Sequence, residues 1–342
     1  MSPASCTSHV WNDRSWPIKP DIVMEGGNNA IDPDTNQADN VDDLSLLTTR
    51  VDLTGPILTT TGDTSGAAAL AARYAAIINA RYPALWPESV RGMLVHSARW
   101  TGKMLEQVPG KKVRDYENRL RCFGYGVPNL DRALTSIESS ATLIIQGSMQ
   151  PFHQVEALKD DGKPSKRIAT KDMHVHTLPW PVRVLQDLGE VEVRMRVTLS
   201  FFIEPSPGRR GWTRKHRYQS HGLLFEVKRP TETTSDLLKR VSDAARDENE
   251  DISFGSDTRN WLFGDRLRRK GSIHSDVWTG TAAELAASEA IAIYPVTGWW
   301  KERHHLGRWN RQARYSLIVT LETDAEDVDL YTPIANEIAI ET

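Results

Sequence analysis

The spacing of apolar residues along the chain changes near residue 140. Before that point, apolar and small residues recur at helical intervals over residues 65–81, and again after Pro87, which suits the first position of a helix. Residues 65–81 are rich in alanine, and side chains this small allow close packing, so we expect a helix that is buried against a sheet. A shorter helix is predicted over residues 130–137.

After residue 140 the spacing of apolar residues falls to two, as in strands with one buried face. Strands are predicted at residues 191–199, 222–228, 290–296 and 315–323, with one acidic helical segment at residues 232–246. Many strands with little helix predict an antiparallel, β-sandwich-like domain. A chain of 342 residues suits two domains, and we place them at residues 1–140 and 141–342, with the boundary within residues 138–150.

Three segments of the first part of the chain show no helical pattern. Residues 16–27 are predicted to form an extended strand that ends in a turn at Gly26 and Gly27. Residues 28–52 are rich in Asp, Asn and Thr, which indicates a surface loop, and residues 101–121 are predicted to be charged and irregular.

Composition narrows the classes of function. Lysine and arginine total 42 against 45 acidic residues, a net charge of -3, so the chain lacks the basic excess of nucleic-acid-binding proteins. The longest run of small apolar residues, 66–78, is shorter than the ~20 residues that cross a membrane. The first residues lack the basic and apolar regions of a signal peptide. Cys6 and Cys122 are the only cysteines, which favours the reducing cytoplasm. Together these features predict a cytoplasmic protein that binds no nucleic acid and no membrane.

The strongest chemical signal is the stretch of residues 60–69, Thr-Thr-Gly-Asp-Thr-Ser-Gly-Ala-Ala-Ala. A glycine-containing turn places Ser65 in the first turn of the predicted helix, where backbone N–H groups and the positive helix end favour developing negative charge. These features suit an acyl-transfer nucleophile. They also suit a simpler interpretation, in which Thr64 or Ser65 only caps the helix.

Four segments, taken in order, resemble the C-terminal part of the catalytic domain of a subtilase, a subtilisin-like serine peptidase. They are residues 19–23 (Lys-Pro-Asp-Ile-Val), 64–65 (Thr-Ser), 86–91 (Trp-Pro-Glu-Ser-Val-Arg) and 124–129 (Gly-Tyr-Gly-Val-Pro-Asn). The resemblance covers about residues 1–140 and implies that Ser65 is the nucleophile and that the substrate is a protein or peptide. It further implies a doubly wound parallel sheet, of which this part of the chain supplies an incomplete portion.

The chain departs from the family pattern in places that bear on catalysis. Asp63 stands where the family usually has glycine two residues before the serine, and Ala69 stands where it has proline. The family's catalytic Asp, catalytic His and oxyanion-hole Asn precede the Lys-Pro-Asp segment, and only 18 residues precede Lys19. His96 matches no catalytic position and is expected to be a core or boundary histidine. We therefore expect the triad to be incomplete in this chain and Ser65 alone to be close to inert.

Metal sites have weak support in the sequence. Asp32, Asp34, Asn36 and Asp43 follow the spacing of a calcium loop, but Gln37 stands where the turn requires glycine. The segment is therefore interpreted either as a calcium site or, with more support, as a solvated acidic loop. Neither His174 with His176 nor the His304–His305 pair has the spacing of a zinc site.

The strand-rich half resembles the C-terminal extension of a bacterial branch of subtilases. The similar segments are residues 178–181, 197–205, 220–222 and 271–276. Members of that branch are often encoded beside an ATPase of the AAA class and implicated in phage defence, so the resemblance implies such a partner. Seven tryptophans in this half could form a binding face, or could fill the core of the domain.

Two functions remain open from the sequence. The first is the nucleophile-bearing portion of a serine endopeptidase that forms an acyl-enzyme at Ser65. The second is a catalytically inactive, truncated peptidase remnant that acts as a protein-interaction module.

Overall fold

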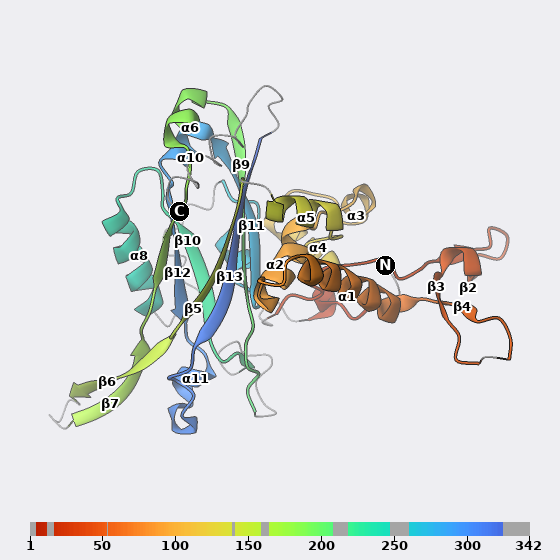
Figure 1. Cartoon of the computed structure of the whole chain (residues 1–342), viewed down its shortest axis with the longest axis horizontal. Helices are drawn as coiled ribbons and strands as arrows, with labels where there is room; N and C mark the ends of the chain where they lie inside the picture. The colour runs from red at the N-terminus through yellow and green to blue at the C-terminus, as the bar shows by residue number, and fades with distance from the viewer. Residues whose placement is uncertain are drawn as a thin grey trace.

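The computed structural model describes residues 5–11, 17–52, 54–138, 141–158, 164–207, 218–246 and 260–323. It is a mixed α/β structure whose strands form several small antiparallel sheets (Figure 1). Helices from the first part of the chain lie on one face of the largest sheet, and a second sheet packs on its other face.

Five helices come from residues 63–138. They are α1 (Asp63–Arg81), α2 (Pro87–Ser97), α3 (Gly102–Gln107), α4 (Val113–Phe123) and α5 (Leu130–Glu138). The helices predicted after Pro87 and at residues 130–137 are confirmed. The prediction that residues 101–121 are irregular was wrong. In α4 the apolar residues Leu120 and Phe123 are buried, and Arg121 forms an ion pair with Glu117. The many charged residues of α4 therefore do not prevent the helix from packing against the protein.

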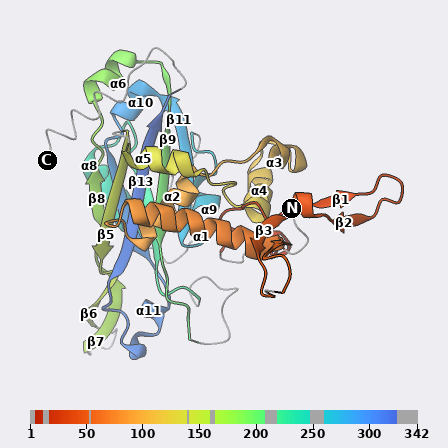
Figure 2. The ribbon, with the colours of Figure 1, turned by 45° about the vertical axis from the view of Figure 1, so that its right-hand side comes forward.

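Two small hairpins project from the body of the molecule near the start of α1 (Figures 1 and 2). They are formed by β1 (Asn29–Ile31) with β2 (Ala38–Asn40), and by β3 (Leu46–Thr49) with β4 (Leu58–Thr61). The short 3₁₀ helix η2 (Asp42–Leu44) lies between the two hairpins in the sequence, whereas η1 (Ser8–Val10) packs on α4. The surface location predicted for residues 28–52 is confirmed, although the segment pairs locally into strands.

The largest sheet has four antiparallel strands in the order β11-β9-β13-β5. These are β5 (Thr142–Met149), β9 (Glu192–Phe201), β11 (Ile273–Thr281) and β13 (Ala313–Glu322). A three-stranded antiparallel sheet has the order β10-β12-β8, from β8 (His174–Thr177), β10 (Gly222–Val227) and β12 (Ala290–Val296). The strands predicted at 191–199, 222–228, 290–296 and 315–323 are therefore present.

One hydrophobic cluster joins the two sheets. Apolar residues at alternate positions of β9, such as Val197 and Leu199, lie in the same cluster as Phe225 of β10 and Ile293 of β12. The short helices α6 (Val182–Leu188) and α10 (Ala282–Ala286) supply further members of the cluster. The antiparallel character predicted for this half is confirmed, while a β-sandwich-like geometry stays a prediction.

The remaining elements lie around these sheets. They are the hairpin of β6 (Phe152–Leu158) with β7 (Pro164–Thr170), the helices α8 (Thr234–Arg246), α9 (Gly264–Arg268) and α11 (Trp299–Glu302), and the 3₁₀ helix η3 (His304–Leu306). The acidic helix predicted at residues 232–246 is confirmed by α8. None of the helices in the described part of the chain is long and apolar enough to cross a membrane.

The expected doubly wound parallel sheet is not seen, because every pairing between the described strands is antiparallel. Residues 17–28 run extended but form no strand, so the segment predicted to be a strand contributes none in its described part. In place of a parallel sheet, α2 packs on β9 and β13 of the four-stranded sheet. Residues of α2, including Val90, Met93 and Leu94, share a cluster with Ile318 of β13.

Helix α1 is also not buried as predicted. Only Gly66 and Ile78 of its 19 residues are fully buried. The reason is that α1 packs mainly beside α2, and no described strand lies along it to cover its alanine-rich surface. The division into domains at residues 1–140 and 141–342 stays a prediction. Because α2 packs on β9 and β13, the two parts of the chain share an extensive contact.

Candidate functional site

Ser65 is the third residue of α1, and its side chain is exposed. The N-cap is Gly62, and no side chain caps the helix. The interpretation of Thr64 or Ser65 as a cap is therefore wrong. The first N–H groups of a helix have no partner within the helix, and the Ser65 hydroxyl lies in this first turn, at the positive end of the helix dipole.

Asp63 holds the turn before the serine in an unusual conformation. Its φ is 63°, in the left-handed region that favours glycine. Its N–H donates to the carbonyl oxygen of Gly26 at 2.6 Å, and a Cβ atom on Gly26 would lie 2.7 Å from the carbonyl oxygen of Asp63. The two turns thus meet at a close approach that requires a glycine at position 26.

The start of α1 also packs against the hairpin of β3 and β4. A Cβ atom on Gly66 would lie 2.6 Å from Cδ1 of Leu46 in β3. Gly66, directly after Ser65, is fully buried, while Ser65 itself points to solvent. The small residue after the serine therefore allows the helix start to pack while the hydroxyl stays accessible.

Ser65 has no base among the described residues. No hydrogen bond in this part of the chain joins its hydroxyl to a His, Asp or Glu side chain. His96 is buried in the last turn of α2, with Nδ1 2.8 Å from Oγ1 of Thr198 and Nε2 2.8 Å from Oγ1 of Thr320. Burial, with the charges of Arg196 and Arg99, holds the pKa of His96 well below its usual range. The prediction of a core histidine is confirmed.

The segments that carry the family resemblance come together in space. The carboxylate of Asp21 lies 2.9 Å from the guanidinium of Arg91 and 2.8 Å from the ammonium of Lys19. The N–H of Tyr125 donates to the carbonyl oxygen of Asp21 at 2.9 Å. Burial raises the pKa of Asp21, but the charges of Arg91 and Lys19 outweigh burial and lower it.

The Gly-Tyr-Gly segment needs both of its glycines. Gly124 and Gly126 have φ values of 55° and 102°. A Cβ atom on Gly124 would lie 2.3 Å from the carbonyl oxygen of Asp21, and one on Gly126 would lie 2.2 Å from that of Arg99. Backbone approaches this close admit no other residue.

Arg91 also connects this assembly to the strand-rich half. Its NH1 group donates to the carbonyl oxygens of Phe201 and Ser272, and to the Ser272 hydroxyl, each at 3.1 Å. One side chain of α2 therefore bonds residues 21, 201 and 272.

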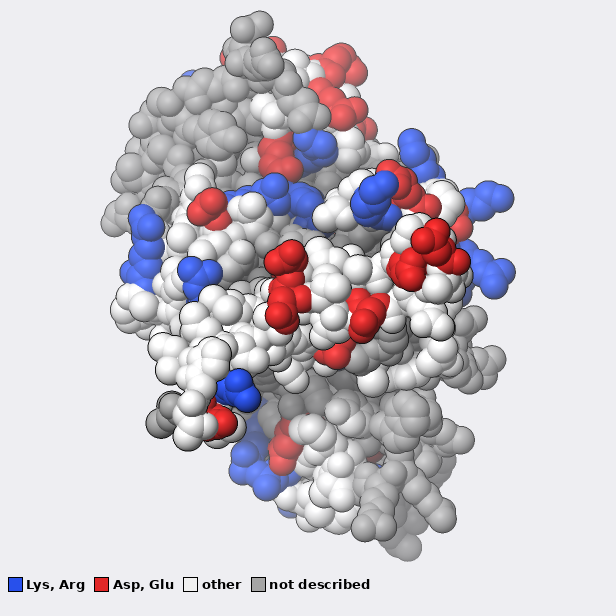
Figure 3. All heavy atoms as spheres, turned by 90° about the vertical axis from the view of Figure 1, so that its right-hand side faces the viewer, with Lys and Arg blue, Asp and Glu red and all other residues white. Residues whose placement is uncertain are grey.

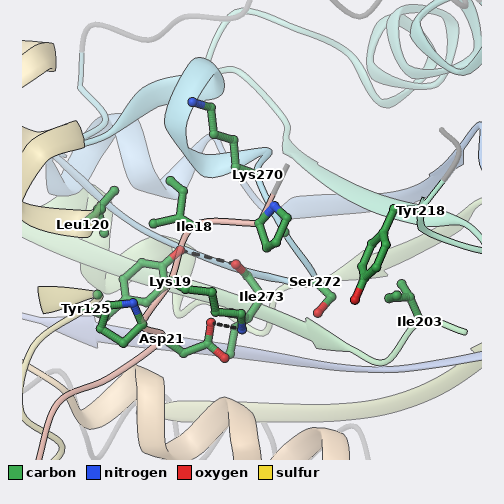
Figure 4. Close-up of a pocket in the computed structure, with 14 residues that line it drawn as sticks. Ile18, Lys19, Asp21, Leu120, Tyr125, Ile203, Tyr218, Lys270, Ser272 and Ile273 are labelled. Atoms are coloured by element: carbon green, nitrogen blue, oxygen red, sulfur yellow. Dashed lines mark hydrogen bonds and ion pairs between the residues drawn. The ribbon is translucent and has the colours of Figure 1, made fainter. Parts of the chain in front are cut away.

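A cavity of about 130 Å³ lies beside this junction (Figure 4). Its lining combines apolar side chains such as Ile18 and Ile203 with the polar groups of Lys19, Tyr218 and Ser272. The sequence analysis missed this cavity because segments far apart in the chain form it. The only hint was that residues 19–21 and 271–273 each belong to a recognised motif. Ser65 is not among its lining residues.

The other residues considered for sites have structural contacts. The carboxylate of Asp32 accepts from the N–H of Asp34 and the hydroxyl of Thr35, as in a closed turn. His174 and His176 both bond the Tyr315 hydroxyl, at 2.6 and 2.9 Å. Within the described ranges, no three His, Cys, Asp or Glu side chains are placed to hold a metal ion.

The tryptophans of the second half mostly pack inside it. Trp180, Trp299 and Trp300 are buried, and Trp261 and Trp278 pack against the core that joins the sheets. Trp309 packs beside Trp299 and Trp300, and Trp212 lies outside the described residues. The structure favours the core interpretation for these side chains.

On the face seen in Figure 3, acidic and basic side chains are interspersed.

Comparison with family models shows a similarity over the first part of the chain. Residues 1–126 of the 342 match the model of the subtilase family. The match includes Ser65 and the contacts of Asp21 and Arg91, and it ends at Gly126, before α5. No curated protein matches the chain.

Proposed function

We propose that the chain carries the nucleophile of a subtilisin-like serine endopeptidase and that Ser65 is this nucleophile. The observation that carries the proposal is the exposed Ser65 hydroxyl in the first turn of α1, within the stretch matched by the subtilase family. The glycine-type conformation of Asp63, at a position where the family usually has glycine, supports the same assignment.

The reaction would proceed through an acyl-enzyme. Oγ of Ser65 attacks the carbonyl carbon of a peptide bond while its proton passes to a base, and the proton then leaves with the amine. The N–H groups at the start of α1 face the negative charge that develops on the carbonyl oxygen. Water hydrolyses the ester and regenerates Ser65.

The base, the carboxylate that orients it and a side-chain oxyanion donor must come from elsewhere. A serine hydroxyl is a weak nucleophile until a positioned base takes its proton, and these groups supply most of the rate. The described residues around Ser65 include no such base. We therefore infer that Ser65 becomes reactive only in an assembly in which another polypeptide segment supplies these groups.

A fluorophosphonate probe tests the proposal, because it reacts covalently only with an activated hydroxyl. The chain would be isolated with its natural partners through a C-terminal tag, labelled, and mapped by mass spectrometry. We expect the label at Ser65 and its loss in Ser65→Ala. Ser235 is the matched control, since it is also exposed in the first turn of a helix, α8, and should stay unlabelled.

The second candidate function is a non-catalytic interaction module. It is favoured by the exposed apolar side chains on the two projecting hairpins and their connections, including Ile31, Leu47 and Ile57 at 66%, 70% and 66% exposure. Apolar side chains exposed together often mark a protein-binding surface. An unlabelled Ser65 in the isolated assembly would favour this function. An ATPase of the AAA class as the partner, and a role in phage defence, stay predictions from the resemblance of the extension.

A further inference from the structure

The side chains of His174, His176 and Tyr315 meet at one oxygen atom. Nδ1 of His174 lies 2.6 Å from the hydroxyl oxygen of Tyr315, and Nε2 of His176 lies 2.9 Å from the same atom. The three rings surround this point, with centroids 5.7 to 6.1 Å apart. We call these three residues the His-His-Tyr cluster.

The His-His-Tyr cluster lies at the edges of the two larger sheets. The histidines belong to β8, an edge strand of the three-stranded sheet, and Tyr315 lies on β13, beside the edge strand β5 of the four-stranded sheet. Both edge strands lie on the left-hand side of the sheets in Figure 2. The Tyr315 ring crosses β5 at Gly147, because a Cβ atom on Gly147 would lie 2.4 Å from the Tyr315 hydroxyl oxygen. Glycine at position 147 therefore allows the hydroxyl to reach the histidines.

Histidines are unexpected at these two positions of β8. Alternate residues of a strand lie on one face, so His174 and His176 share the face of their cross-strand neighbours, Ile293 and Ile291 of β12. Both isoleucines are fully buried and belong to the hydrophobic cluster that joins the sheets, as does Tyr315. Apolar side chains would suit the same face of β8 without any polar atom to satisfy. The pair of imidazoles therefore indicates a role beyond packing.

Hydrogen bonding alone uses the cluster only in part. A tyrosine hydroxyl has one proton, so it can donate to one imidazole while it accepts an N–H bond from the other. A metal ion can instead accept an electron pair from all three atoms. Imidazole nitrogens are preferred ligands of Zn²⁺ and Cu²⁺, and sites with two histidines and one oxygen ligand are common for zinc.

We propose that His174, His176 and Tyr315 bind a divalent transition-metal ion of the zinc and copper type. Ligand atoms of a tetrahedral site lie about 2.0–2.1 Å from the metal, which places them roughly 3.3 Å from one another. A movement of roughly 0.4–0.7 Å at each histidine therefore makes room for the ion, and no larger cavity is needed.

The ion can enter from solvent at the sheet edges. Both histidines are partly exposed, so their side chains can move by this amount and water can supply the fourth ligand. The hydroxyl of Tyr315 releases its proton to solvent when the cation binds, because a bound cation favours the ionised oxygen.

A bound ion links the two sheets, since its ligands come from β8 of one sheet and β13 of the other. It therefore stabilises the folded chain. The sequence did not predict this site because the third ligand is a tyrosine that lies 139 residues beyond His176. The site is independent of the peptidase function, since its three residues lie outside the stretch that matches the subtilase family.

Calorimetric titration of the full chain with Zn²⁺, after treatment with a chelator, tests the proposal. We expect a single ion to bind and the Tm to rise on binding. His176→Gln should weaken Zn²⁺ binding by at least about tenfold. His174→Gln should have the same effect, and it decides if His176→Gln does not fold.

Other side chains that attract zinc provide the controls. His304 and His305 form an exposed pair, and Cys6 is an exposed free thiol. The double substitution His304→Gln with His305→Gln should leave the Zn²⁺ affinity unchanged, and so should Cys6→Ser.

Tyr315→Phe tests the third ligand, because phenylalanine keeps the ring and removes the oxygen. We expect the Zn²⁺ affinity to fall by about tenfold or more. Cu²⁺ gives a second readout, since a phenolate bound to Cu²⁺ absorbs visible light by charge transfer. This band should appear in the wild type and be lost in Tyr315→Phe, whereas a tyrosine that only forms hydrogen bonds gives no such band.

The proposal is overturned if the chain binds no Zn²⁺ or if the wild type shows no phenolate band with Cu²⁺. It is also overturned if Zn²⁺ binding keeps its affinity in Tyr315→Phe or in the histidine variant that decides. Loss of Zn²⁺ binding in either control variant would place the ion elsewhere and would overturn it as well.

Discussion

The carboxylate of Asp21 lies 2.9 Å from the guanidinium of Arg91, and this pair joins two segments that are 70 residues apart in the sequence. Both segments belong to the stretch that matches the subtilase family. Arg91 also donates to the backbone at residues 201 and 272, far outside that stretch. Arg91 is thus one of the side chains that join the family-like part to the strand-rich part.

Replacing Arg91 should therefore destabilise the whole fold. Arg91→Met removes four hydrogen bonds and leaves Asp21 partly buried, with only Lys19 as a charged partner. We expect the free energy of unfolding to fall by about 2–4 kcal/mol, as measured by urea denaturation. Lys103→Met is the control, because the Lys103–Glu106 pair is highly exposed and should contribute less than about 1 kcal/mol. Equal effects of the two substitutions would contradict this role of Arg91.

The close packing of α2 on the sheet can be tested at Gly92. A Cβ atom there would lie 2.8 Å from Cδ1 of Ile318 and 3.4 Å from Cβ of Ser200. We expect Gly92→Ala to destabilise the protein by about 1–2 kcal/mol, since crowding outweighs the gain in helix propensity. Gly102→Ala in α3 has nothing within 4 Å and should be neutral or stabilising by up to about 1 kcal/mol. A stabilising Gly92→Ala would show that α2 does not pack this closely.

The left-handed conformation of Asp63 predicts an unusual gain from glycine. Asp63→Gly should stabilise the protein by about 0.5–1 kcal/mol, because glycine adopts a φ of 63° without strain. Thr64→Gly, one residue further into α1, should destabilise it by a similar amount. Thermal unfolding of the two variants measures both effects. The same sign of change in both would argue against strain at Asp63.

His221 predicts a pH dependence of stability. Burial lowers the pKa of His221 to about 3, whereas an unfolded histidine titrates near 6.5. The folded protein therefore binds one proton fewer than the unfolded chain between these values. The free energy of unfolding should fall as the pH drops from 6.5 towards 3, by up to about 1.4 kcal/mol per pH unit from this residue.

His221→Phe should reduce that slope by one proton, because phenylalanine retains the ring packing against Phe201 and Trp300 without titrating. Urea denaturation at pH 4, 5, 6 and 7 provides the measurement. His305→Gln, at an exposed position, should leave the slope unchanged. An unchanged slope in His221→Phe would mean that His221 binds the same number of protons in the folded and unfolded states, so that burial does not lower its pKa.

Local patterns predicted many of the elements. The alternation across β9 follows directly from one face that meets the core and one that faces α2, as in Val197 beside Thr198. The helix that starts at Pro87 follows from the fixed φ of proline at that position. Ser65 was placed in the first turn of a helix because glycine precedes an alanine-rich run, and the structure has it there.

The spatial arrangement could not be predicted from those patterns. The alanines of α1 fit a buried helix, but whether anything covers them depends on partners that local sequence does not specify. The α2 helix lies on β9 and β13, more than 90 residues away in the chain, through contacts such as His96 with Thr198 and Thr320. The cavity at Lys19, Tyr218 and Ser272 likewise arises from residues that only the fold brings together.

The reactivity of the Ser65 hydroxyl decides whether this chain carries a nucleophile. The decisive measurement is the fraction of Ser65 modified by a fluorophosphonate probe, quantified by mass spectrometry in two samples. One sample is the purified 342-residue chain, and the other is the assembly isolated with its natural partners. We predict no modification in the chain alone, because no described residue acts as the base of Ser65. In the assembly we predict a modification of Ser65 that is lost in Ser65→Ala. An assembly in which Ser65 stays unmodified would contradict the nucleophile assignment, and rapid modification of the chain alone would contradict the missing base.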